Sequence, residues 1–69
     1  MAPPRPVGDE VLILKTLGEL GEADPIKIGR QIDRTTPHVE YLCRYMLGHG
    51  YLTRVGRRYR LSPSGAEEL

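Results

Sequence analysis

Hydrogen-bonding and cationic side chains gather in two short stretches in the second half of the chain. One stretch covers residues 35–45, and the other holds Arg57 and Arg58. Arginine can donate two parallel hydrogen bonds to a guanine edge and also pairs with phosphate oxygens. Hydroxyl, imidazole and phenol groups add further hydrogen bonds to phosphates and bases. These residue types point to nucleic-acid binding rather than to catalysis.

The charge of the chain is small but unevenly distributed. The formal net charge is +1, and the acidic residues collect toward the two ends. Residues 29–61 include seven Arg, no Lys and two acids, Asp33 and Glu40, so this segment carries a charge of +5. The excess predicts a local basic face that attracts polyanions, although the chain as a whole is no polycation.

A first helix is predicted near the start of the chain. Asp9 is the expected cap, and apolar residues then recur every three or four positions as far as Leu20. Gly21 ends this helix. Residues 22–25 are expected to form an irregular connector to the next element.

Two further helices are predicted, and the second of these carries most of the first polar stretch. Pro25 suits the first position of a short second helix that ends at Asp33. Thr36 is the expected cap of a third helix, which begins at Pro37 and runs to about His49. The third helix has an apolar face and a polar face. The apolar face holds Val39, Leu42, Cys43 and Met46, and the polar face holds His38, Tyr41, Arg44 and Tyr45.

A β-hairpin is predicted after the third helix. Its two alternating runs cover residues 51–55 and 59–62, and Gly56, Arg57 and Arg58 join them. Ser62 and Pro63 then start a last short helix. The order helix, helix, helix, strand, strand, helix predicts a winged helix-turn-helix, a mainly α fold with a two-stranded β wing. Residues 1–7 are expected to form a disordered tail and residues 8–69 the domain.

In such a fold the third helix enters the major groove of duplex DNA, and the wing contacts the backbone or the minor groove. The expected DNA-binding residues are Thr35, Thr36, His38, Tyr41, Arg44, Tyr45, Arg57, Arg58, Arg34 and Arg30. Arg44 is the expected guanine contact, and the wing arginines would meet phosphates. Because one copy makes few phosphate contacts, we expect a homodimer on a two-fold symmetric site.

Simpler explanations remain open for several of these side chains. Arg30 and Arg34 could only keep a helix surface solvated, and charges at the hairpin turn could prevent edge-to-edge association. Tyr45 could pack on the hairpin with its hydroxyl at the rim. Two alternative functions also remain open: a protein-interaction module, and binding of RNA or of non-B-form nucleic acid.

Other kinds of site find little support in the sequence. His38, Cys43 and His49 would lie on different faces of a helix, which argues against a shared zinc ion. Cys43 lies in the apolar stripe and is expected to be a core residue. No Ser-His-Asp, phosphate-loop or dinucleotide-binding pattern occurs, so we expect no enzymatic activity, no cofactor and no small-molecule ligand.

The sequence also predicts where the protein resides. The longest apolar run, residues 11–14, is far shorter than a membrane span requires. A single cysteine agrees with a reducing compartment. We therefore expect a cytoplasmic protein that does not enter a membrane.

From Asp9 onward the chain resembles winged-helix transcription regulators of prokaryotes, in particular the small phage-repressor-like family common in archaea. The resemblance rests on DEVLIL at 9–14, IGRQIDRT at 28–35, Val39 through the Gly-Tyr-Leu exit at 50–52, and GRRYRLSPSG at 56–65. It implies a repressor-like regulator. It also implies that the third helix and the turn before it bind DNA through Thr35, Thr36, His38, Tyr41 and Arg44. The wing would bind DNA through Arg57 and Arg58.

Overall fold

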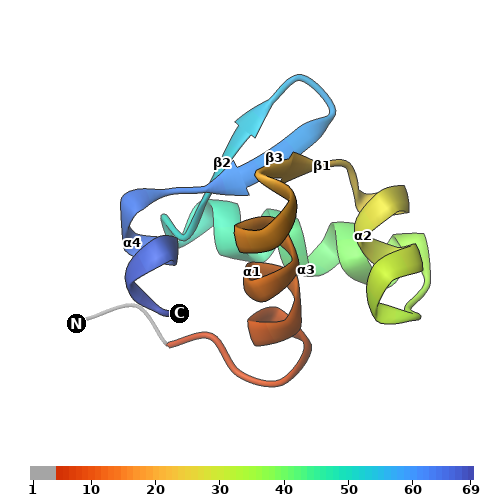
Figure 1. Ribbon diagram of the computed structural model, residues 1–69, viewed down its shortest axis with the longest axis horizontal. Coiled ribbons are helices and arrows are strands. Elements are labelled where there is room, and N and C mark those ends of the chain that lie inside the picture. The colour runs from red at the N-terminus through yellow and green to blue at the C-terminus, as the bar shows by residue number, and fades with distance from the viewer. Residues whose placement is uncertain (1–4) are drawn as a thin grey trace.

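The computed structural model describes residues 5–69, which form four helices and one three-stranded antiparallel sheet (Figure 1). In chain order the elements are α1 (Asp9–Leu20), β1 (Glu22–Ala23), α2 (Pro25–Ile32), α3 (Thr36–Gly48), β2 (Leu52–Val55), β3 (Arg58–Leu61) and α4 (Pro63–Glu67). The prediction of a mainly helical domain with a small β element is confirmed. The prediction of only two strands is wrong.

The additional strand, β1, lies in the segment expected to be an irregular connector. Glu22 pairs with Arg60 and Ala23 with Tyr59, so the strand order is β1-β3-β2 with β3 in the centre. Two residues are too few to show the alternation that marks a strand in a sequence. The partner strand supplies the hydrogen bonds, and the sheet thereby joins the end of α1 to the hairpin (Figure 1).

Two helices begin one residue earlier than predicted. Gly8 caps α1 with φ 58°, a positive value that suits glycine, and Asp9 is already helical. Thr35 caps α3, and its side chain makes no capping hydrogen bond. The predicted caps Asp9 and Thr36 are therefore wrong. The Asp9 carboxylate instead accepts hydrogen bonds from Arg34 and contacts the His38 ring.

The starts of the two shorter helices are fixed by side-chain caps followed by proline. The Asp24 carboxylate accepts a hydrogen bond from the Lys27 backbone N–H at 2.8 Å, at the start of α2. The Ser62 hydroxyl accepts one from the Gly65 N–H at 3.0 Å, which confirms the predicted start of α4. Each cap satisfies an N–H that the helix itself leaves unpaired.

One core lies between the helices and the sheet. It consists of Ile13, Leu14 and Leu17 of α1, Ala23 of β1, Ile28 of α2, Val39, Cys43 and Met46 of α3, and Tyr51, Leu52 and Tyr59. Leu42, expected on the buried face of α3, is only partly buried and packs against this cluster. Each fully buried aliphatic side chain stabilises the fold by about 1.5 to 3 kcal/mol.

Burial of Cys43 predicts a thiol that does not react in the native protein. Its side chain is fully enclosed, and burial, with a smaller effect of the Glu40 charge, raises the pKa of the thiol to about 12. Because the thiolate is the reactive form, we expect a disulfide reagent near pH ~8 to label the native protein at least about a hundredfold more slowly than the urea-unfolded protein. Equal labelling rates in the two states would contradict this prediction.

Residues 5–7 form neither helix nor strand, but they contact the domain. Arg5 Nε lies 3.2 Å from Glu68 Oε1, and the Val7 N–H donates to Glu10 Oε1 at 3.0 Å. Residues 1–4 of the predicted tail lie outside the described part of the chain. Within the described part, every helix is too short or too polar to cross a bilayer.

Candidate nucleic-acid interface

A tight turn sets the start of α3 against α2. Asp33 ends α2 in the left-handed conformation, with φ 57° and ψ 53°, and the Arg34 N–H donates to the Gly29 carbonyl at 2.9 Å. A Cβ atom on Gly29 would lie 2.7 Å from the Arg34 carbonyl oxygen. Glycine is therefore required at this position, and the turn holds the first residues of α3 in a defined place.

The face of α3 turned away from the core carries three of the predicted residues. Val39, Cys43 and Met46 are fully buried, whereas Tyr41 is 67% exposed and the Arg44 side chain is 66% exposed. Tyr45 is less exposed, and its ring centroid lies 4.4 Å from that of His49. Tyr45 thus makes its ring contact with the residue that caps the C-terminal end of α3, and Tyr41 and Arg44 are the more exposed of the three.

Arg34 and His38 are held on one flank of α3 by the carboxylate of Asp9. Arg34 Nε and Nη2 lie 3.0 and 3.2 Å from the two Asp9 oxygens, and His38 Nε2 lies 3.0 Å from Asp9 Oδ2. Hydrogen bonds hold the pKa of the Asp9 carboxyl below its ordinary value, the bond from Arg34 having the larger effect and the bond from His38 the smaller. The bond between Arg34 and Asp9 also raises the pKa of Arg34. Both predicted DNA contacts therefore already have a partner within the protein.

This ion-pair cluster predicts a pH-dependent stability difference between the wild type and Asp9→Asn. The folded-state pKa of Asp9 lies below its ordinary value of 3.8, so the stabilisation is present above that value and is lost as the pH falls through the folded pKa. Urea unfolding of the two proteins is measured at a series of pH values. The free energies of unfolding of the wild type and of Asp9→Asn should differ near neutrality and converge in acid. A difference that stays constant down to the lowest pH would contradict this origin.

A groove of about 330 Å³ separates α3 from the hairpin. It is lined by Asp24, Pro25, Ile26, Thr36, Glu40, Arg54, Arg57 and Tyr59. Both acids in it already have partners, because Asp24 caps α2 and Glu40 Oε1 accepts from Arg44 Nη2 at 3.1 Å. Arg57 has no ion-pair partner among residues 5–69. The free charge at this groove is therefore positive.

Arg54 lines the groove but is not among the predicted DNA contacts. The two-residue alternation of β2 places Arg54 on the same face as buried Leu52, toward the helices. Arg54 Nε donates to the Gly56 carbonyl at 2.9 Å, which fixes the side chain beside the turn. The same alternation, applied to the sequence, would have identified Arg54 as a partner of Arg57.

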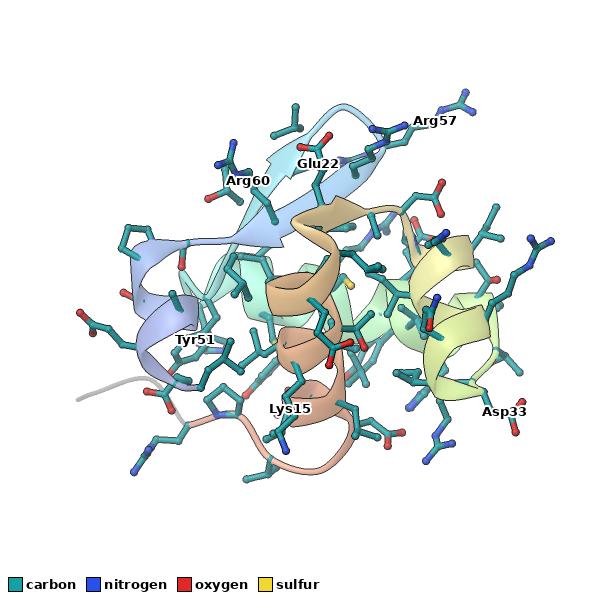
Figure 2. All side chains as sticks on the ribbon, viewed as in Figure 1. Lys15, Glu22, Asp33, Tyr51, Arg57 and Arg60 are labelled. Carbon is teal, nitrogen blue, oxygen red and sulfur yellow. The ribbon has the colours of Figure 1, made fainter. Side chains whose placement is uncertain are left out.

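The two predicted wing arginines lie on different surfaces. Arg57 is in the turn and lines the groove, and Figure 2 shows it projecting from the tip of the hairpin. Arg58 belongs to β3 rather than to the turn, and its Nη1 lies 3.1 Å from Glu22 Oε1 of β1. Arg60 follows two residues later and, with Glu22, points away from the helices (Figure 2).

The structure thus brings together only part of the predicted set. The groove is lined by Thr36, Glu40, Arg54 and Arg57, Arg44 is hydrogen-bonded to Glu40, and Tyr41 is exposed on the same helix. We name these six residues the α3–hairpin surface. Thr35 is exposed in the preceding turn, and Arg30 is exposed on α2 without an ion-pair partner in the described chain. Among residues 5–69, the His, Cys, Asp and Glu side chains form no group of three that could hold a metal ion.

Comparison of the chain with protein families, with curated proteins and with solved structures gave no match.

Proposed function

We propose that this chain is a winged helix-turn-helix domain that binds duplex DNA in the cytoplasm of a prokaryote as a repressor-like regulator of transcription. One observation carries the proposal. Thr36 and Glu40 of α3 and two of the hairpin arginines, Arg54 and Arg57, line the same groove, and the exposed Arg44 is hydrogen-bonded to Glu40 at its edge. A helix and a basic hairpin on one side of a small domain match the two grooves and the phosphate strand of a duplex.

In this proposal the exposed face of α3 lies in the major groove, whose width admits a helix. Tyr41 and Arg44 reach the base edges, and Thr36 binds the backbone at the start of the helix. Arg57, which has no ion-pair partner within the described chain, binds a phosphate or enters the minor groove, and Arg54 supports it. Arg34 and His38 contribute only if the DNA displaces Asp9.

One copy of the domain covers a short site. The described chain measures 33 × 20 × 20 Å. Its longest dimension is about the length of one helical turn of DNA. Few phosphates can be neutralised over that distance, so a single copy binds weakly. We therefore propose that two copies act as a homodimer on half-sites related by two-fold symmetry.

A titration of the ¹⁵N-labelled protein with a mixed-sequence DNA duplex tests the proposal. Amide shifts are expected at residues 36–45 and 54–57, and they should fade as the salt concentration rises because counterions compete for the phosphates. The duplex RNA of the same sequence serves as the matched competitor. Shifts confined to α4, or stronger binding of RNA, would contradict duplex DNA as the ligand.

A protein-interaction module is the second candidate, and a specific observation favours it. Four of the predicted contacts already face carboxylates: Arg34 and His38 face Asp9, Arg44 faces Glu40, and Arg58 faces Glu22. Pairing of this kind reduces the positive potential that a polyanion would meet. Absence of any amide shift with duplex DNA at low salt would favour this candidate.

A further inference from the structure

Glu40 is an unusual residue for a surface that faces DNA. Its side chain is 45% exposed, and it lines the groove between α3 and the hairpin. A carboxylate there is repelled by phosphates, and it only accepts hydrogen bonds. On a DNA-binding face it therefore lowers affinity unless donors compensate it.

Arg44 provides the first of these donors. It lies four residues after Glu40, and at this spacing two side chains stand one above the other on a helix. Arg44 Nη2 donates to Glu40 Oε1 at 3.1 Å. The pair is exposed on both sides, so in the free protein it contributes little to stability. Its effect is to orient the guanidinium of Arg44 and to keep the carboxylate beside it.

Base edges in the major groove provide the second kind of donor. Cytosine presents only its N4 amino group there, whereas adenine presents its N6 amino group beside the acceptor N7. The acceptor N7 repels a carboxylate, so Glu40 favours cytosine over adenine. Arg44 favours guanine, whose O6 and N7 both accept hydrogen bonds.

We propose that Glu40 and Arg44 form one reading unit that selects a cytosine and a neighbouring or paired guanine. This inference rests on the proposed binding of duplex DNA and adds the chemistry of its preferred site. Arg44 donates to guanine O6 and N7. Glu40 accepts from cytosine N4 and holds Arg44 in place. Glu40 is therefore a specificity-determining residue, although its charge opposes binding in general.

Selection from a pool of randomised duplexes tests the reading unit. The full chain, Glu40→Gln and Arg44→Ala are each used to enrich bound sequences. Glutamine pairs with adenine N6 and N7, so Glu40→Gln should change one preferred base from cytosine to adenine. The ratio of the affinities for the cytosine and adenine sites should change by between about 5-fold and 150-fold. Arg44→Ala should remove the preference for guanine. Glu19→Gln, which removes an exposed carboxylate from α1, is the matched control and should leave the selected site unchanged.

The outcomes separate the inference from the proposed function. If Glu40→Gln and the wild type enrich the same bases at every position, the reading unit is wrong and the proposed DNA binding stands. A wild-type site without a preferred G·C pair has the same meaning. If the wild type retains no duplex at all, both proposals fail. Thermal melting followed by circular dichroism confirms that each variant is folded before selection.

Discussion

Gly65→Ala is expected to unfold the C-terminal part of the domain. A Cβ atom at this position would lie 2.0 Å from the Tyr51 carbonyl oxygen and 3.0 Å from its carbonyl carbon. Both are backbone atoms, and the same oxygen accepts the Ser62 N–H at 3.1 Å. Because backbone cannot move aside without breaking that bond, we expect the free energy of unfolding to fall by roughly 3 kcal/mol or more.

Gly48→Ala is the matched control for this variant. Gly48 also lies in a helix, but a Cβ atom there would meet nothing within 4 Å. Alanine loses less conformational freedom than glycine on folding, so a gain of about 0.5 to 1 kcal/mol is expected. Urea denaturation followed by circular dichroism measures both variants. If the free energy of unfolding changes equally in the two variants, the contact with Tyr51 does not determine the loss of stability in Gly65→Ala.

The second large effect concerns binding. Replacing both Arg54 and Arg57 with alanine should weaken duplex binding at least about tenfold for every sequence, because hydrogen bonds to charged groups are lost. Each lost phosphate contact should also make the plot of the log of the association constant against the log of the salt concentration less steep, by about 1 in slope. Fluorescence anisotropy with a labelled duplex at several salt concentrations measures both quantities.

A second double variant isolates the contribution of the groove. Arg58→Ala with Arg60→Ala removes the same charge from the same hairpin, but from the face that points away from the helices. We expect its affinity and salt slope to remain closer to those of the wild type. If the two double variants bind alike, general charge rather than the groove controls affinity, and the α3–hairpin surface is not the binding site.

The helices could be predicted because their signals are local. The apolar spacing of α1 and α3, and the proline at the start of α2 and of α4, lie within each helix. Strand β1 could not be predicted in this way, because its two residues become a strand only by pairing with β3. The Asp9 contacts with Arg34 and His38 likewise join residues 25 and 29 positions apart, so they depend on how the helices pack.

The hairpin shows the limit of prediction for the candidate site. The sequence predicts a turn of three residues, whereas the turn contains two, with Gly56 at φ 63°. A difference of one residue moves a side chain to the opposite face of a strand. The predicted turn therefore puts Arg58 at the tip, whereas Arg58 faces Glu22 in the structure. Arg54 lines the groove but is missing from the predicted contacts.

The contact between Arg5 and Glu68 has a consequence for how copies of this domain could be joined. It brings together two residues that are 63 positions apart in sequence. In Figure 1, α4 and the C-terminus lie on the left, whereas the hairpin turn lies at the top. A flexible tether attached near Arg5 or Glu68 would leave the groove open. Two tethered copies could then bind one duplex together, with an avidity set by the length of the tether.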